Sequence, residues 1–510
     1  MSKHFLHELR SVFESQPSRP ALAYEGRVVT YGELDAEARN WAGRLQARGV
    51  ERGDRVALYT GNKIPFLLAQ LGVLYAGACP LPLNPRFTRE EMRYFLSDSE
   101  ARMVIAGAEE LPLVAALAPE LPGPPLVQAD VDDGTPGHFR EPNVAADASR
   151  MILYSSGTTG WPKGVVHTHA GTAGSLQALQ TCWQLSADDV VLNVLPLYHI
   201  HGLEFATHLT WLAGGCIRIE ESFDVGRTLA AIGESTVFMA VPAIYYRLLE
   251  SAEFRTAAAS WSRTRLFTCG SAPIRPEVLP ELEEILRHPV INRYGMSESY
   301  VITSLPLAGP WPSGSVGLPL PEMERKVVRS DGSPVEPGEV GSVLIRSPNL
   351  FREYWHKPEE TRAAFRDGWF DTDDLGSLDE RGFLTLAGRK KDLIITNGYN
   401  VYPQVVERVL GDCPGVKECA AFGIPDADRG ERVAAAIVRS DLTLDEARLH
   451  AWCSDRLVIY QRPRTLLFVD ALPKNTLGKV LRRELVACVT GASAGGAGAS
   501  SAAQPGPKRD

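Results

Sequence analysis

Short apolar runs of four or five residues alternate along the chain with longer segments of mixed apolar and polar positions. The clearest short runs are 55–59, 151–154, 190–194 and 237–240, and the clearest helical segments are 30–48 and 276–287. Short runs rich in β-branched residues are typical of buried strands, and the longer pattern is typical of amphipathic helices. Their alternation predicts an α/β fold of layered subdomains with largely parallel sheets.

The pattern changes twice in the second half of the chain. From about residue 323, short strands follow closely on one another, with turn dipeptides at 331–332 and 337–338. After the basic run 389–391, the pattern becomes that of a small α+β unit. Its strongest segments are helices near 404–410 and 444–457 and strands near 418–424 and 432–438.

A chain of 510 residues is too long for one core, because single hydrophobic cores stop growing at about 250–300 residues. We predict a large N-terminal domain, 1–390, with a β-rich subdomain from about 323, followed by a small mobile C-terminal domain, 391–490. The last segment, 491–510, is rich in Gly, Ala, Ser and Pro and is expected to be disordered.

Charge and cysteine spacing exclude several classes of partner. A net charge of -9 argues against nucleic-acid binding, which needs a basic face to replace counterions on phosphate. The eight cysteines form no CxxC pair and have no histidines at zinc-finger spacing. We therefore expect reduced thiols, no structural zinc and no nucleic-acid partner.

Neither a secretory leader nor a membrane span is predicted. The first ten residues lack the apolar stretch and small-residue cleavage site of a leader. The longest apolar stretch, Phe66–Leu83, is interrupted by glycines and prolines, so it predicts a buried helix and turn. We expect a soluble, cytoplasmic protein, and the sequence leaves its oligomeric state open.

The sharpest local signal is the segment YSSGTTGWPKG at 154–164, where a strand enters a loop dense in hydroxyls and glycines. Glycines let backbone N–H groups approach phosphate oxygens, hydroxyls add donors, and Lys163 adds positive charge. The loop is not a Walker loop, because GxxxxGKS/T needs glycine where Pro162 stands. We interpret it as a phosphate-binding loop formed by Ser155, Ser156, Gly157, Thr158, Thr159, Gly160 and Lys163.

From this loop onward the chain resembles the adenylate-forming superfamily of acyl-CoA synthetases, luciferases and peptide-synthetase adenylation domains. The segment GSAP at 270–273 resembles the family's adenine-side loop, and YGMSE at 294–298 resembles its YGxTE motif. The resemblance implies that Tyr294 stacks on adenine, the Ser297 hydroxyl meets the α-phosphate, and Glu298 holds Mg²⁺. The implied nucleotide-binding residues here are Gly270, Ser271, Ala272, Pro273, Tyr294, Gly295 and Met296.

The segment GWFDTDDLG at 368–376 resembles the family's GWFxTGDLG, which implies that Asp374 binds the ribose hydroxyls. The chain departs from the family here, because Asp373 replaces the usual glycine. An added carboxylate beside a polyanionic nucleotide opposes ATP binding. If the backbone at this position needs φ > 0, aspartate is among the residues that tolerate it.

Three later segments complete the resemblance. GRKKD at 388–392 matches the junction of the two family domains, with Arg389 at ribose or phosphate and Lys391 at the hinge. NGYN at 397–400 matches the loop that approaches pantetheine, through Gly398 and Tyr399. LPKNTLGK at 472–479 matches the motif that carries the family's catalytic lysine, which implies that role for Lys479.

These residue types fit one reaction. A carboxylate oxygen attacks the α-phosphorus of ATP, pyrophosphate leaves, and the thiol of coenzyme A then opens the acyl-adenylate. Charge builds up on phosphate oxygens in the first step, and preorganised cations stabilise it: Mg²⁺ on Glu298, Lys163, and Lys479. A hinge at Lys391 lets the small domain serve both steps. The expected substrates are therefore ATP and CoA with a small carboxylic acid, and the expected metal is Mg²⁺.

Four residues indicate which acid is activated. The resemblance places His199 and His201, in LPLYHIHGL at 195–203, at the acyl-pocket entrance, and places Arg247 and Arg293 beside the pocket. A cation beside an apolar acyl chain is costly to desolvate, whereas a dicarboxylate removes that cost. The subfamily that combines PLYHxHGL, VPxxYxRLL and RYGMTE is the malonyl-CoA synthetases, so malonate or methylmalonate is the expected acid.

Other interpretations stay open. The acid is a medium-chain or aromatic one if the arginines turn to solvent. A non-catalytic nucleotide-binding regulator is disfavoured by the presence of both Glu298 and Lys479. An adenylation domain that loads a carrier protein is disfavoured because no carrier domain follows in this sequence.

Overall fold

The computed structural model describes residues 3–130, 137–155, 161–426, 428–474 and 480–490. This part of the chain divides into two compact units. The large unit runs to Thr372 and includes Gly376–Leu386, and the small unit comprises Asp373–Leu375 and the chain from Ala387 onward. The division falls between Leu386 and Ala387, a few residues before the expected boundary.

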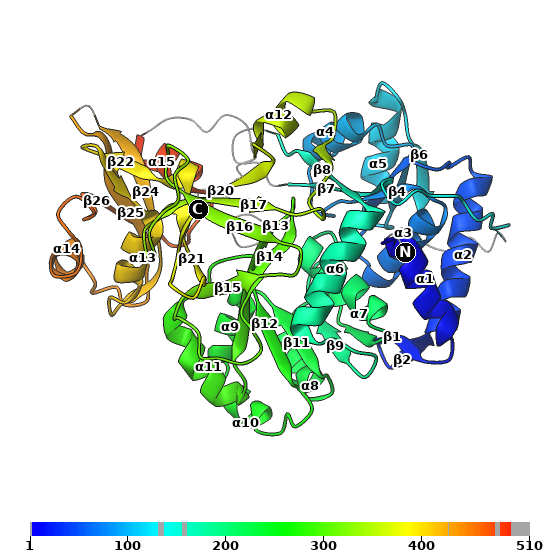
Figure 1. Ribbon diagram of the computed structural model, residues 1–510, viewed down its shortest axis with the longest axis horizontal. Helices are drawn as coiled ribbons and strands as arrows, with labels where there is room; N and C mark the ends of the chain where they lie inside the picture. The colour runs from blue at the N-terminus through cyan, green and yellow to red at the C-terminus, as the bar shows by residue number, and fades with distance from the viewer. Residues whose placement is uncertain (1–2, 131–136, 156–160, 427, 475–479, 491–510) are drawn as a thin grey trace, which may run out of the picture. The chain divides into compact units, whose positions relative to one another are not determined.

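A 14-stranded sheet forms the centre of the large unit (Figure 1). In sheet order, its strands are β16 (Glu324–Val328), β17 (Gly341–Arg346), β20 (Trp369–Leu378), β21 (Leu384–Arg389), β15 (Ser315–Pro319), β14 (Tyr300–Ser304), β13 (Val290–Met296), β12 (Leu266–Cys269), β11 (Val237–Ala240), β9 (Val190–Asn193), β10 (Cys216–Ile219), β1 (Pro20–Tyr24) and β2 (Arg27–Thr30), with β19 (Phe365–Arg366) paired to β20. Between β1 and β13 in this order, every neighbouring pair is parallel. The predicted parallel α/β layer is therefore confirmed.

The segment after residue 323, predicted as a β-rich subdomain of the N-terminal domain, is rich in strands, and these strands extend the same sheet. Its strands β16, β17, β20 and β21 continue the sheet beyond β15, and the pairs β16–β17 and β15–β21 are antiparallel. The helices of the large unit's central part are α1 (Phe5–Ser15), α6 (His169–Trp183), α7 (Leu209–Leu212), α8 (Val225–Gly233), α9 (Pro242–Leu249), α10 (Phe254–Ala258), α11 (Leu279–Leu286) and α12 (Pro358–Ala363).

A second sheet of the large unit is parallel throughout. Its strands, in order, are β4 (Cys79–Pro82), β3 (Arg55–Tyr59), β5 (Met103–Ala106) and β6 (Leu126–Ala129), with helices α2 (Tyr31–Ala47), α3 (Lys63–Tyr75), α4 (Arg89–Ser99) and α5 (Leu111–Leu117) around them. Helix α2 begins at a capping box, in which Thr30 and Glu33 satisfy each other's backbone N–H groups. The stretch Phe66–Leu83 is the end of α3, a turn at residues 76–77 and strand β4, so the predicted buried helix and turn are confirmed.

A short three-stranded sheet positions the phosphate-binding loop. It has the order β18 (Glu353–Tyr354), β8 (Gly164–Thr168) and β7 (Ser149–Tyr154), and both pairings are antiparallel. Its inner residues Ile152 and Val166 are fully buried. The loop between β7 and β8 is the segment that contains the glycine- and hydroxyl-rich motif.

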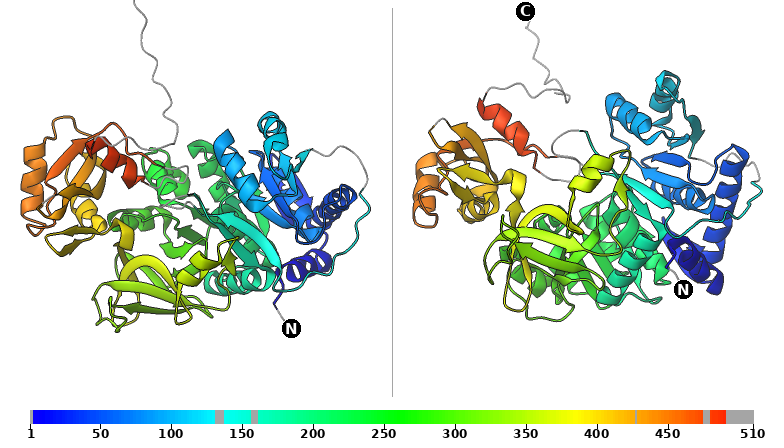
Figure 2. Two further views of the ribbon diagram at one scale, coloured as in Figure 1. Left: turned by 90° about the horizontal axis from the view of Figure 1, so that it is seen from above. Right: turned by 45° about the horizontal axis from the view of Figure 1, so that its top comes forward.

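The small unit is a five-stranded sheet with helices on both faces (Figure 2). Its elements are β22 (Ile394–Thr396), β23 (Tyr399–Val401), α13 (Pro403–Gly411), β24 (Val416–Asp426), β25 (Gly430–Arg439), α14 (Glu446–Ser454), β26 (Thr465–Phe468) and α15 (Arg482–Thr490). Helices α13 and α14 pack on one face of the sheet, and Leu485 of α15 packs on the other. The predicted small α+β unit is present.

No helix in the described part of the chain has the length and apolar character needed to cross a bilayer.

Candidate active site

The phosphate-binding loop leaves strand β7 and returns in β8. Tyr154 and Gly164 are paired across the two strands, and the backbone N–H of Ser155 donates to the carbonyl of Lys163 at 2.9 Å. These bonds hold the first and last residues of the loop together. Its central residues, Ser156, Gly157, Thr158, Thr159 and Gly160, lie outside the described residues.

Tyr354 links the loop lysine to the expected metal-binding glutamate. The Nζ atom of Lys163 lies 4.7 Å from the centroid of the Tyr354 ring, and the Tyr354 hydroxyl donates to Glu298 Oε1 at 3.0 Å. Glu298 is only 7% exposed, and its carbonyl accepts from the Phe351 N–H at 2.8 Å. Strand β18 places Tyr354 opposite Val165 of β8. Sequence reasoning missed Tyr354, because an aromatic residue in a two-residue strand carries no recognisable signal.

The YGMSE motif is held in a tight bend between β13 and β14. A Cβ at Gly295 would lie 1.9 Å from the Tyr300 carbonyl oxygen, so only glycine fits there. Tyr300 itself has φ of 59°, an uncommon left-handed conformation for a bulky residue. The Ser297 carbonyl accepts from His167 Nε2 at 2.7 Å. These constraints fix the positions of Tyr294, Ser297 and Glu298 before any nucleotide binds.

The two predicted histidines mark the start of a π-helix, η2 (His201–His208). Its Gly202 carbonyl accepts two side-chain bonds, from Asn193 Nδ2 at 2.9 Å and from Thr207 Oγ1 at 2.8 Å. A Cβ on Gly202 would lie 2.3 Å from the carbonyl oxygen of Pro196, so glycine is required. π-Helices are rare and occur frequently at functional sites. Sequence reasoning did not predict this one.

His201, Ser271 and Arg293 form a buried polar group, here called the arginine cluster. Arg293 Nη2 donates to Ser271 Oγ at 3.2 Å, and Ser271 Oγ lies 3.3 Å from His201 Nδ1. The Arg293 guanidinium lies 4.8 Å from the ring centroid of Phe205, on the π-helix. A Cβ on Gly270 would lie 2.5 Å from Arg293 Nε, so this glycine makes room for the arginine.

Two hydrogen-bond donors of the arginine cluster are unsatisfied. Because Ser271 Oγ accepts from Arg293, its own hydrogen is available to His201 Nδ1, which leaves the His201 proton on Nε2. Among the described residues, neither His201 Nε2 nor Arg293 Nε has a hydrogen-bond partner. Buried donors without partners are rare and point to an absent acceptor.

Burial sets the charge of this cluster. It lowers the pKa of His199 to about 4, assisted by the nearby charge of Arg293, and it lowers the pKa of His201 well below its ordinary value. Burial also lowers the pKa of Arg293 to about 10, which leaves the guanidinium charged at neutral pH. The cluster and the neighbouring His199 therefore carry together one positive charge and two neutral imidazoles at neutral pH, a combination suited to an anion.

The predicted partnership of Arg247 with Arg293 is not seen. Arg247 is exposed on α9, and its guanidinium lies 4.8 Å from the ring centroid of Phe223. The inward face of α9 carries Ile244, Tyr245 and Leu248 instead. His199 is partly buried, and its Nδ1 accepts from the His201 N–H at 3.2 Å, so it supports the start of the π-helix.

The expected ribose and hinge residues lie in the small unit. Arg389 Nε is 3.3 Å from Asp374 Oδ1, and Asp374 is 6% exposed. Asp373 is exposed with φ of 59°, so the backbone does need the conformation that its usual glycine provides, and aspartate adopts it here. Burial lowers the pKa of Lys391, and the charge of Arg389 adds to this effect.

The pantetheine-loop residues are also in the small unit. Gly398 has φ of 79°, and Tyr399 is exposed and stacked on Tyr460, with ring centroids 4.5 Å apart. Lys474 Nζ pairs with Glu418 at 2.8 Å. Lys479, the expected catalytic lysine, lies outside the described residues.

A protein-built cage for a metal is not present in the described part of the chain, where no group of three His, Cys, Asp or Glu side chains is arranged to hold a metal ion. The single carboxylate of Glu298 fits Mg²⁺ nonetheless, because Mg²⁺ is usually held by one or two carboxylates together with substrate phosphates and water. Glu298 is therefore suited to a metal that arrives with the nucleotide.

Two family models match the sequence: AMP-binding enzyme at residues 9–355, and AMP-binding enzyme C-terminal domain at residues 405–479. The chain belongs to the AMP-binding, adenylate-forming family of acid–CoA ligases. The first match covers the phosphate-binding loop, the π-helix and the YGMSE motif. The second covers most of the small unit and ends at Lys479.

Individual relatives agree on the family and differ in their acids. The bovine mitochondrial malonate–CoA ligase ACSF3 is 36% identical over 87% of this chain and 83% of its own. The long-chain-fatty-acid–CoA ligase FadD13 of Mycobacterium tuberculosis is 34% identical over 90% of this chain and 92% of its own. The ATP-bound structure of MatB from Rhodopseudomonas palustris superposes with a TM-score of 0.90 at 35% identity, covering 95% of this chain and 98% of its own.

Proposed function

We propose that this ligase activates malonate, with methylmalonate as a related substrate, and converts it with ATP and CoA to malonyl-CoA, AMP and diphosphate. The observation that carries the proposal is the arginine cluster. Arg293 is 4% exposed, and no carboxylate in the described part of the chain forms an ion pair with it. An acid with a second carboxylate supplies the missing anion.

The alternative acids fit this environment less well. A buried charge without a partner is expensive, and the apolar chain of a fatty acid or the ring of an aromatic acid would leave Arg293 uncompensated. The unreactive carboxylate of malonate offers acceptors to Arg293 Nε and His201 Nε2, the two donors without partners. Charge-assisted bonds of this kind are about twice as strong as neutral ones.

The first half-reaction needs positive charge around the phosphates. The reactive carboxylate attacks the α-phosphorus, and charge grows on the departing diphosphate. Mg²⁺, when bound, would help to neutralise this charge, and Glu298 would be the residue that holds it. Lys163 is held beside Tyr354 at the end of the phosphate-binding loop. By the family resemblance, Lys479 supplies a further cation in this step.

The second half-reaction needs a thiol. The sulfur of CoA attacks the acyl carbonyl, and AMP leaves with the phosphate oxygen that had joined it to the acyl group. The exposed Tyr399 fits a role beside pantetheine. Lys391 fits the role of a hinge about which the small domain turns between the two half-reactions.

A panel of acids tests the proposal directly. With Mg²⁺, ATP and CoA, the purified protein is expected to release AMP and diphosphate, and malonate should give a higher kcat/KM than acetate, octanoate or benzoate. Products are separated by chromatography, and each acid is assayed with and without CoA. ADP as a product would contradict the adenylate route, and a preference for octanoate or benzoate would contradict the dicarboxylate assignment alone.

The Tyr354 hydroxyl should matter to metal binding. Tyr354→Phe keeps the ring under Lys163 and removes the bond to Glu298, so the carboxylate loses one of its orienting donors. A hydrogen bond to a charged group is worth about 1.5–3 kcal/mol. We expect the Mg²⁺ concentration for half-maximal rate to rise about tenfold or more, with the KM for malonate little changed. An unchanged Mg²⁺ requirement would mean that Tyr354 has no part in metal binding.

A further inference from the structure

On the π-helix that also carries His201 of the arginine cluster, the protein buries a charged group that the reaction described above does not use. Arg150 of β7 donates from Nη1 to Glu204 Oε1 at 2.8 Å and from Nη2 to His208 Nδ1 at 2.8 Å. His208 Nε2 lies 3.1 Å from Gln70 Oε1 of α3. The side chains of Arg150, Glu204 and His208, here called the Arg150 network, are all 0% exposed. Glu204 and His208 both belong to the π-helix.

The hydrogen bonds define the charges in the Arg150 network. Burial alone favours a neutral Glu204, but the charge of Arg150 outweighs burial and lowers the pKa of Glu204 to about 2. Burial lowers the pKa of His208, against the opposing effect of Glu204. Because His208 Nδ1 accepts from Arg150, the neutral imidazole carries its proton on Nε2 and donates to Gln70. The network is thus one ion pair with a neutral histidine.

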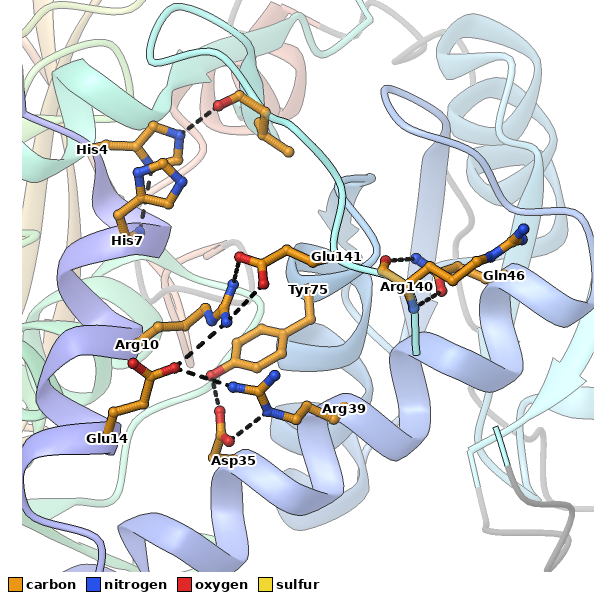
Figure 3. A network of polar contacts seen from close by, with 11 residues as sticks. His4, His7, Arg10, Glu14, Asp35, Arg39, Gln46, Tyr75, Arg140 and Glu141 are labelled. Atoms are coloured by element: carbon orange, nitrogen blue, oxygen red, sulfur yellow. Dashed lines mark hydrogen bonds and ion pairs between the residues drawn. The ribbon is translucent and has the colours of Figure 1, made fainter. Parts of the chain in front are cut away.

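Helix α1 covers the Arg150 network. The Phe5 ring centroid lies 3.8 Å from the Arg150 guanidinium carbon and 5.2 Å from the His208 ring centroid. Figure 3 shows how the same helix is fastened: His4 bonds to the carbonyl of Val144, and Arg10 pairs with Glu141. The aromatic cover excludes water, which strengthens the electrostatic interactions beneath it.

The Arg150 network adjoins residues that contact both the arginine cluster and the nucleotide motif. On one side, the π-helix that contains Glu204 also carries His201 and Phe205, and Phe205 packs against Arg293. On the other side, the charges of Arg150 and Glu204 both act on the fully buried hydroxyl of Tyr300, which bonds to Thr172 at 2.8 Å.

Tyr300 connects this group to the nucleotide motif. Its ring lies 4.4 Å from that of His167, and His167 holds the Ser297 carbonyl. The ring of Phe205 lies 6.3 Å from that of Tyr300. The arginine cluster and the nucleotide motif are therefore joined by a continuous series of buried contacts.

Stability alone does not account for such a group. A buried ion pair seldom stabilises a protein more than apolar residues of similar volume, because both charges must be desolvated. This one is also incompletely satisfied: among the described residues, Arg150 Nε has no hydrogen-bond partner, and Glu204 Oε2 lies 3.2 Å from His208 Nδ1 without a hydrogen bond. The pair instead orients the π-helix. Because the planar guanidinium of Arg150 bonds to Glu204 and His208 in a fixed geometry, it fixes the rotation of the π-helix about its axis.

We propose that Arg150, Glu204 and His208 are positioning residues that hold the π-helix so that His201 and Phe205 meet Arg293 in the geometry the acid requires. The identity of that acid rests on the proposed function. The positioning role itself concerns whichever acid the wild-type enzyme uses best. None of the three residues touches a substrate in this account, and they act through His201 and Phe205.

Paired substitutions separate positioning from stability. Glu204→Gln leaves the Arg150 charge without its counterion, so it should lower the melting temperature. The double variant Arg150→Met/Glu204→Met removes both charges at similar volume and should melt at or above the temperature of Glu204→Gln. Both variants should lose about ten- to a hundredfold in kcat/KM for the best acid, mainly through KM, with the KM for ATP little changed.

A matched control comes from the ion pair Arg265–Asp189, which lies at the opposite, amino-terminal ends of β12 and β9 and joins Arg265 Nη2 to Asp189 Oδ2 at 2.6 Å. Arg265→Met/Asp189→Asn should change the melting temperature and leave the KM for the acid as in wild type. All kinetics use the acid with the highest wild-type kcat/KM, so that a failure of the malonate assignment does not affect this test.

Three results would overturn the proposal. One is a stable double variant with wild-type acid kinetics. Another is an equal rise in the KM for the acid and the KM for ATP in every variant, including the control. If the double variant does not fold, Glu204→Gln measured below its melting temperature decides: a wild-type KM for the acid would overturn the proposal, and a raised KM for the acid alone would support it.

Discussion

Lys479→Ala is expected to slow formation of the acyl-adenylate by about two or more orders of magnitude, the scale for losing one preorganised electrostatic contact in an active site. Opening of a supplied acyl-adenylate by CoA should stay largely intact. In the first half-reaction, negative charge accumulates on the phosphates of ATP, and a lysine stabilises it. In the second half-reaction, AMP leaves with its own phosphate, and the thiol of CoA must enter the space that the lysine occupied. One side chain therefore separates the two steps.

The two half-reactions are measured independently. Diphosphate release with acid and ATP reports the first, and AMP release from synthetic malonyl-adenylate with CoA reports the second. Lys474→Ala is the matched control, because Lys474 belongs to the same motif and pairs with Glu418. It should leave both rates near those of wild type. Equal loss of both half-reactions in Lys479→Ala would assign Lys479 a structural role and contradict the hinge model.

Much of the fold follows from local pattern. Strands 55–59 and 237–240 have the predicted bounds, and α2 occupies all but the capping residues of the segment predicted as a helix. These elements are buried on both faces or carry clear caps, so the local sequence alone specifies them. The β-rich segment after residue 323 shows the limit: turn signals identify its strands but not the sheet to which they add.

The π-helix marks a second limit. Its sequence HGLEFATH contains two histidines and a glutamate, which resembles a solvated or metal-binding segment more than a core helix. Yet all of its residues are buried, because Glu204 and His208 find Arg150, a residue 54 positions away from Glu204 in the chain. Partners so distant in sequence cannot be inferred from periodicity.

In the candidate site, the sequence predicted the residues of the motifs but not the residues that contact them and hold them in place. Asp373 was expected to tolerate a left-handed backbone, and its φ of 59° agrees. Arg247 was placed with Arg293 by resemblance, but the burial of Ile244, Tyr245 and Leu248 turns a different face of α9 inward. Tyr354 was missed because its importance lies only in what it contacts.

Arg293→Met is expected to raise the KM for malonate about ten- to a hundredfold while changing the KM for ATP little. Methionine keeps most of the length and apolar packing against Phe205 but removes the charge and the Nε donor. Loss of a charge-assisted hydrogen bond costs about 1.5–3 kcal/mol, which corresponds to roughly one to two decades in kcat/KM. Without the cation, monocarboxylates no longer meet an uncompensated charge, so the ratio of kcat/KM for octanoate to kcat/KM for malonate should rise.

Two further arginine variants make this comparison decisive. Arg247→Met tests whether Arg247 binds malonate, as the sequence indicated, or stacks on Phe223 at the surface, as in the structure. If Arg247 binds malonate, Arg247→Met and Arg293→Met should both raise the KM for malonate. If Arg247 only stacks on Phe223, Arg293→Met alone should raise it. Arg227→Met, on the exposed surface of α8, controls for loss of positive charge in general. Each enzyme is assayed on malonate and octanoate at saturating ATP. If Arg293→Met keeps full malonate activity, Arg293 does not bind a second carboxylate. If wild type already prefers octanoate, the acid of this ligase must be sought among monocarboxylates.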